Sequence, residues 1–156
     1  MLTDCLLFLI PLLLSALVSL PIFWFAPLLV YFFYKKPLSE ALVWTFVAGI
    51  CLDLIHPALR FGITPLFMLI TTLVLYEQKR HFFFDSLTTF PLMTLLYSLI
   101  FTLLLALWVQ PPLTLSWAIS DLVLMPLLDA SAAFISITLP LMLLGPKRRK
   151  GEDYFL

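Results

Sequence analysis

The chain has 156 residues, of which 63% are hydrophobic, 15% are aromatic and only 12% are charged, and its formal net charge is zero. Soluble domains have about 45–50% apolar and about 25% charged residues, so the composition predicts an integral membrane protein with a single helical domain. The balanced charge excludes the basic surface of a nucleic-acid-binding protein. Cys5 and Cys51 lack the spacing of a metal or redox motif, so no disulfide or metal site is predicted.

The amino-terminal part of the chain is an apolar stretch interrupted by prolines. It covers residues 6–34 and is longer than the about 20 residues that one perpendicular span needs. Two interpretations remain open: one long, kinked helix, or two short spans that turn between Pro21 and Pro27. These prolines, with Trp24 between them as an interfacial anchor, favour two spans, which we place at residues 3–20 and 22–34.

Further apolar stretches follow, separated by short loops that contain charged residues or proline. They predict spans over residues 42–57, 63–77, 88–109 and 121–144. The expected fold is an all-α bundle of six transmembrane helices, or of five if the first stretch is a single helix.

The lysines and arginines predict the orientation of these spans. Eight of the nine fall in three segments, at residues 35–36, 79–80 and 147–150. All three segments lie on the same side if the carboxyl end is cytoplasmic, and cytoplasmic loops carry an excess of Lys and Arg. We therefore predict a cytoplasmic carboxyl end, with the turns at residues 57–62 and 110–116 outside. Six spans place the amino end in the cytoplasm, and five place it outside.

Residues 46–65 combine apolar helix sequence with three ionisable side chains, and glycines and prolines there mark the end of one helix and the start of the next. Asp53 and His56 are three residues apart and share a helix face, and Arg60 in the turn can fold back onto Asp53. A charge in a membrane segment costs at least about 2.5–3.5 kcal/mol. Two interpretations follow: a salt bridge that fixes the turn, or an external cluster with Asp121 that receives a partner.

Two carboxyls lie in the last predicted span. Asp121 and Asp129 are separated by about 80° around a helix, so they do not stack. Asp121 is expected near the membrane interface, and Asp129 about two turns deeper. The small residues at 130–133 indicate close helix packing. The favoured interpretation is a packing seam with one hydrogen-bonded carboxyl, and a proton or substrate site is the alternative.

Catalytic and cofactor-binding motifs are not found in the sequence. His56 and His81 fall on opposite sides of the membrane in the predicted topology, so they cannot share a metal ion or act together as a base. The four glycines do not form a phosphate-binding loop. We therefore predict a protein that is not an enzyme and that has no catalytic residue, cofactor or metal.

The sequence GICLDLIHPALRFGITPLFMLITTLVLY, which begins at Gly49, resembles the middle of the MreD family of bacterial rod-shape-determining membrane proteins. That family has a glycine-bearing helix that ends in an Asp-Leu pair, then a short external turn with glycine and a helix that closes on a basic loop. This pattern is matched by Asp53, by Gly62 and by residues 76–80, where the second helix is expected to end in a basic loop. Pro126, in DLVLMPLLDASAAF, resembles the proline of the final MreD helix.

The resemblance implies a six-helix bundle in the bacterial inner membrane, similar to the substrate-binding subunits of energy-coupling-factor vitamin transporters. It also implies a non-enzymatic role, namely binding the single-span scaffold MreC in the complex that directs lateral peptidoglycan synthesis. That complex further contains MreB, RodA and a class B penicillin-binding protein.

Two other functions stay open. The chain could be a subunit of such a transporter that binds a small, vitamin-like molecule at the outer polar cluster. It could also be a small membrane protein of unrelated fold whose charges only pair internally. The scarcity of polar residues favours the scaffold, because a ligand pocket needs several converging polar groups.

Overall fold

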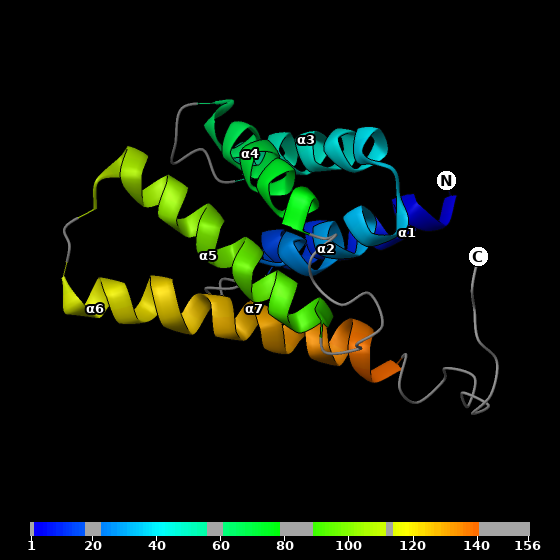
Figure 1. The fold of residues 1–156 in the computed structure, drawn as a ribbon. Coiled ribbons are helices and arrows are strands. Elements are labelled where there is room, and N and C mark those ends of the chain that lie inside the picture. The colour runs from blue at the N-terminus through cyan, green and yellow to red at the C-terminus, as the bar shows by residue number, and fades with distance from the viewer. Residues whose placement is uncertain (1, 18–22, 56–60, 79–88, 112–113, 141–156) are drawn as a thin grey trace.

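The computed structural model describes residues 2–17, 23–55, 61–78, 89–111 and 114–140, and these residues are helical throughout apart from short connections (Figure 1). They form six helices, and the all-α prediction is thereby confirmed for this part of the chain. The first five are α1 (Leu2–Leu17), α2 (Phe25–Lys35), α3 (Leu38–Ile55), α4 (Ile63–Gln78) and α5 (Thr89–Val109).

The sixth helix, Leu115–Thr138, is continuous but changes its winding three times. It consists of α6 (Leu115–Trp117), the π-helical segment η1 (Ala118–Leu124), α7 (Met125–Ala133) and the π-helical segment η2 (Phe134–Thr138). It begins at Leu115 rather than at the predicted residue 121, because Thr114 caps it. The Thr114 Oγ1 accepts a hydrogen bond from the Trp117 backbone N–H at 3.2 Å, as an N-cap side chain does.

The apolar stretch at residues 6–34 forms two helices, α1 and α2, as the prolines had favoured. The two helices pack against each other, with the rings of Phe8 and Phe25 at 5.3 Å between centroids. Residues 18–22, which include Pro21, lie outside the described residues. The α2 helix is central in the bundle, because it contacts α1, α3, α5 and α7 and buries most of its side chains.

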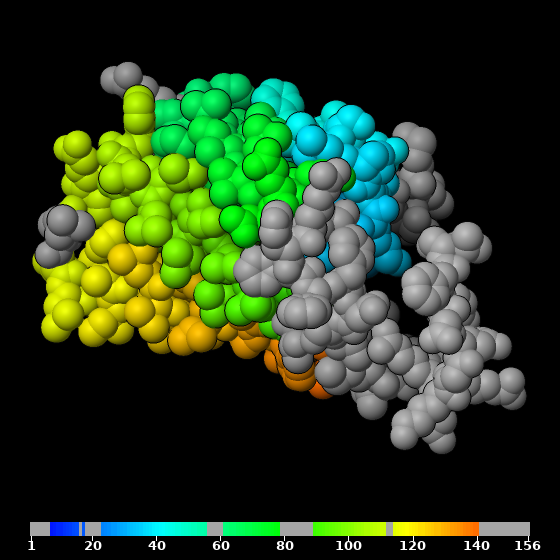
Figure 2. Space-filling view, in the orientation of Figure 1, coloured from blue at the N-terminus to red at the C-terminus, as the bar shows by residue number. Residues whose placement is uncertain are grey.

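Among the described residues, three helices are long and apolar enough to cross a membrane: Leu38–Ile55, Thr89–Val109 and Leu115–Thr138. The α2 and α4 helices are also apolar but shorter. Figure 2 shows α5 and the sixth helix next to each other on one face of the molecule. Leu107 of α5 is 76% exposed and Leu115 of the sixth helix is 78% exposed. Apolar side chains exposed on this scale would associate in water, whereas they match the hydrocarbon of a lipid bilayer.

Candidate functional site

The turn between α3 and α4 is fixed by a buried carboxylate. Asp53, near the end of α3, is 5% exposed, and its Oδ2 accepts a hydrogen bond from the Gly62 backbone N–H at 2.6 Å. The Gly62 carbonyl in turn accepts from the Leu66 N–H at 3.3 Å, which starts α4. Backbone N–H groups at a helix start have no partner within the helix, so an acidic side chain there is favourable. Asp53 therefore holds the start of α4 against the end of α3.

A glycine lets these two helices approach closely. A Cβ placed on Gly49 of α3 would lie 2.3 Å from the Cα of Pro65 in α4. No side chain fits at that distance unless the backbone of one helix moves. Gly49 and the bond from Asp53 to Gly62 thus define one compact unit, which we call the α3–α4 corner (Gly49, Asp53, Gly62 and Pro65).

Two of the predicted polar residues near this corner, His56 and Arg60, lie outside the described residues. Their proposed interaction with Asp53 stays a prediction, and the partner observed for Asp53 is a backbone N–H. Asp121 is half-buried in η1, and its Oδ1 accepts a hydrogen bond from the Ser120 hydroxyl at 2.7 Å. Asp53 and Asp121 therefore bind different groups in this structure.

Replacing Gly62 with alanine is expected to destabilise the protein by about 1–2 kcal/mol, because Gly62 has a φ of +96° and a Cβ is unfavourable in that region. Nothing lies within 4 Å of the position that the Cβ would take, so only backbone strain contributes. Thermal unfolding in detergent, followed by circular dichroism, measures the loss. Gly62→Asn is the matched variant and should lose less, since asparagine tolerates positive φ better. Equal stability of Gly62→Ala and the wild type would contradict this description of the turn.

Asp129 joins three helices in the interior of the bundle. Its side chain is fully buried in α7. The Oδ1 accepts a hydrogen bond from the Phe23 backbone N–H, just before α2, at 2.7 Å, and the Oδ2 accepts one from the Ser98 hydroxyl of α5. Trp24, the N-cap residue of α2, makes no side-chain capping bond. Asp129 therefore satisfies, from a distant helix, a backbone N–H that lies just before α2.

The sequence predicted a hydrogen-bonded carboxyl at Asp129 but not its two partners. They lie 106 and 31 residues away along the chain. One available signal is the recurrence of Thr94, Ser98 and Thr102 at every fourth position, since small polar residues mark helix-packing faces. All three are buried in α5.

A chain of hydroxyl groups links α3, α4 and α5. The Thr45 and Thr72 Oγ1 atoms are 3.2 Å apart, and the Thr72 Oγ1 and Tyr97 hydroxyl are 3.3 Å apart. The Tyr97 hydroxyl also reaches the Met68 carbonyl of α4 at 3.3 Å. Because Thr45, Thr72 and Tyr97 are all buried, these contacts satisfy polar groups that have no access to water.

Replacing Tyr97 with phenylalanine is expected to lower stability by about 0.5–1.5 kcal/mol, since it removes one member of this chain and leaves the packing volume unchanged. The unfolding midpoint in a fixed detergent measures the effect. Tyr31→Phe is the control. Tyr31 is a half-buried tyrosine of α2, and its hydroxyl is not among the linked hydroxyl groups of Thr45, Thr72 and Tyr97. If both variants lose the same stability, the hydroxyl chain contributes nothing specific.

These buried polar groups hold helices in contact with one another. The carboxylates of Asp53 and Asp129 are each buried and each occupied by a backbone N–H. Within the described ranges, no group of three His, Cys, Asp or Glu side chains is close enough to hold a metal ion. What the observed geometry provides is fixed contact between helices.

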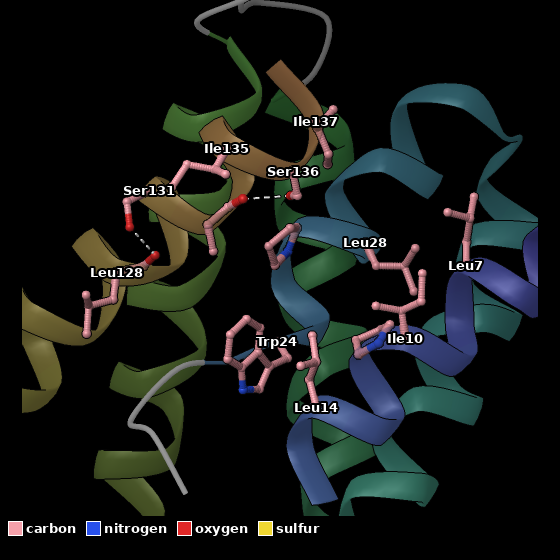
Figure 3. A pocket seen from close by; sticks show the side chains of 13 residues that line it. Leu7, Ile10, Leu14, Trp24, Leu28, Leu128, Ser131, Ile135, Ser136 and Ile137 are labelled. Carbon is pink, nitrogen blue, oxygen red and sulfur yellow. Dashed lines mark hydrogen bonds between the residues drawn. The ribbon is translucent and has the colours of Figure 1, made fainter. Parts of the chain in front are cut away.

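The structure also contains a pocket of about 520 Å³ between α1, α2 and the sixth helix (Figure 3). Leu28 of α2 and the N-cap residue Trp24 form one wall, and Leu128 and Ile135 of the sixth helix form another. The pocket lies beside the Asp129 site, because Phe23 and Asp129 are the sequence neighbours of Trp24 and Leu128.

Comparison of the chain with protein-family models, with curated proteins and with solved structures finds no match. The resemblance to MreD therefore depends on the residues of the chain itself. Of those residues, Gly49, Asp53 and Gly62 belong to the α3–α4 corner.

Proposed function

We propose that the chain is a non-enzymatic membrane component of the bacterial rod-elongation complex, similar to MreD, that binds an MreC-like single-span protein. The observation that carries this proposal is the α3–α4 corner. Three residues on which the resemblance depends act together there: Gly49 allows the contact with Pro65, and Asp53 binds the Gly62 N–H. The resemblance thus coincides with one structural unit and does not consist only of scattered apolar positions.

The positions of the basic residues support an outward-facing corner. Lys35 and Lys36 lie where α2 ends and α3 begins, at the opposite end of α3 from Asp53. A helix of 18 residues is about 27 Å long, close to the hydrocarbon thickness of a bilayer. With Lys35 and Lys36 in the cytoplasm, as the excess of basic residues in cytoplasmic loops favours, the corner is at the external surface of the inner membrane.

Apolar side chains at this corner offer a surface for the proposed partner. Leu54 and Phe61 are each 68% exposed, and they flank Asp53 and Gly62 in the sequence. Large aromatic residues are enriched at protein interfaces. The buried polar groups of the corner keep this surface rigid, so Leu54 and Phe61 are the residues through which we expect contact with an MreC-like protein.

The transporter alternative has less support from the pocket. Of its 13 lining residues only the two serines and Trp24 carry a polar side-chain group. Both serine hydroxyls already bind carbonyls of their own helix, so the buried Trp24 indole N–H is the one donor without a partner among the described residues. A vitamin-like ligand needs several convergent polar groups for its orientation and specificity. The described pocket does not offer that set, so we favour the scaffold.

Affinity purification from native membranes tests the proposed function. The tagged chain would be isolated in a mild detergent and its companions quantified by mass spectrometry, with an unrelated tagged membrane protein as the control. We expect enrichment of an MreC-like protein, accompanied by RodA, the class B penicillin-binding protein and MreB in smaller amounts. Enrichment of an energising transporter subunit would favour the alternative. The absence of an MreC-like protein from preparations of rod-shaped cells would contradict the proposal.

A further inference from the structure

The pocket between α1, α2 and the sixth helix has the chemistry of a hydrocarbon site. None of its lining residues is charged, and most are leucine, isoleucine, proline or alanine. The Ser131 hydroxyl donates to the Leu128 carbonyl at 2.7 Å, and the Ser136 hydroxyl donates to the Ala132 carbonyl at 2.6 Å (Figure 3). The Trp24 indole N–H is the one buried donor of the lining without a hydrogen-bond partner among the described residues. A ligand with several polar groups would lose hydrogen bonds on entering such a pocket, whereas a hydrocarbon chain has none to lose.

The rim of the pocket continues into the apolar outer surface of the bundle. Ile10 of α1 is 56% exposed and Ile135 of η2 is 64% exposed, and both line the pocket. An occupant can therefore enter sideways from the same environment that contacts the exposed leucines of α5 and the sixth helix. In a bilayer that environment consists of lipid tails.

The volume of the pocket fits a single chain of methylene groups better than a protein helix. At roughly 30 Å³ for a group about the size of a water molecule, a pocket of about 520 Å³ has room for on the order of 15 methylene groups. A helix with side chains is about 10–12 Å in diameter, so two of its turns occupy roughly 850–1,200 Å³, which exceeds the volume of this pocket. A second copy of this chain, or the membrane span of another protein, therefore fits less well than one lipid tail.

Two features of the structure maintain the pocket. The bond from the Phe23 N–H to Asp129 ties α2 to α7, one residue away from the wall residues Trp24 and Leu128. The second feature is η2, which forms part of the wall on the sixth helix. It contributes Ile135, Ser136 and Ile137 to the lining. π-Helical turns are rare and are frequently found at functional sites. Here η2 places three consecutive side chains along the pocket.

From this geometry we propose that the pocket binds one acyl chain of a membrane lipid, which enters from the bilayer. The lipid tail then fills the space between α1 and the sixth helix and completes the packing around α2. The proposal needs a membrane around the bundle but no partner protein, so its failure would leave the proposed scaffold function untouched, and the reverse also holds.

Photolabelling in proteoliposomes tests this assignment. The full chain would be reconstituted in phosphatidylethanolamine and phosphatidylglycerol with a small fraction of a phospholipid that carries a diazirine in the middle of one tail. After illumination, the labelled residues are mapped by mass spectrometry. We expect adducts to be several-fold enriched at Leu128 and Ile135 over Leu127, which is 54% exposed on the same helix and lies outside the pocket. Labelling of each residue in proportion to the exposed fraction of its side chain would overturn the proposal, and this outcome can be seen with the wild-type protein alone.

A matched pair of variants sharpens the test. Ser136→Phe places a ring in the pocket and should reduce labelling there several-fold. Ser120→Phe is the control, because Ser120 is also an exposed serine in a π-helical segment of the sixth helix but does not line the pocket. Unchanged pocket labelling in a folded, monodisperse Ser136→Phe protein would contradict the proposal. So would crosslinks from Ile135 to a second copy of the chain in place of lipid adducts.

Discussion

Asp129→Ala is expected to lower the free energy of unfolding by about 2–4 kcal/mol, because it leaves two buried donors, the Phe23 N–H and the Ser98 hydroxyl, without an acceptor. Each unsatisfied buried donor costs about 1–3 kcal/mol. The loss would be measured by titration with sodium dodecyl sulfate from a mild detergent, with helix content followed by circular dichroism. Asp129→Asn keeps one carbonyl oxygen as an acceptor, so its loss should lie between those of the wild type and Asp129→Ala.

The control for this prediction is Asp121→Ala, which removes a carboxyl from the same helix. Asp121 is half-buried and bonded only to the neighbouring Ser120 hydroxyl among the contacts described above. Its replacement should change stability by no more than about 0.5 kcal/mol, as for most surface substitutions. If Asp121→Ala and Asp129→Ala lose equal stability, Asp129 does not tie the three helices together.

Gly49→Ala is expected to destabilise the protein by about 1–3 kcal/mol through overpacking against α4. Helix propensity alone would make Gly49→Ala stabilising, since alanine is favoured over glycine by about 1 kcal/mol in a helix. The contact decides the outcome, because the new Cβ would lie 2.3 Å from the Cα of Pro65. That neighbour is a backbone atom, so it cannot move away as the end of a flexible side chain would.

The unfolding midpoint under the same detergent conditions measures this effect. Val43→Ile also adds one carbon to α3, but at an exposed position, and it should leave the midpoint unchanged. A Gly49→Ala protein that is more stable than the wild type would show that propensity prevails and that α3 and α4 are not in close contact at Gly49.

The helices themselves could be predicted well, because hydropathy and helix-breaking residues act locally. A lysine and a proline lie between the end of α2 and the start of α3, and a glycine lies just before the start of α4. These residues are visible in the sequence. The start of the sixth helix was placed too late. Its cap, Thr114, follows two prolines, and the sequence gives this threonine little weight beside Asp121.

The interior contacts could not be predicted for a physical reason. When both faces of a helix are apolar, hydrophobic periodicity does not identify the face that meets a neighbour. The pairing of Asp129 with Phe23 and Ser98 depends on how α2, α5 and α7 pack. The same is true of the hydroxyl chain through Tyr97 and of the pocket. At the α3–α4 corner the sequence did identify Asp53, as a member of a charged cluster, and Gly62, as the glycine of the turn, but it did not identify them as partners of each other.

Photocrosslinking from the α3–α4 corner tests the proposed scaffold role most directly. A photoreactive amino acid at Phe61, in cells that produce the chain at its natural level, should form a crosslink to an MreC-like single-span protein. The same amino acid at Leu107, which is at least as exposed but lies near the end of α5, is the control and should give little of that product. Equal yields from both positions, or no MreC-like product from Phe61 in rod-shaped cells, would contradict the proposed function.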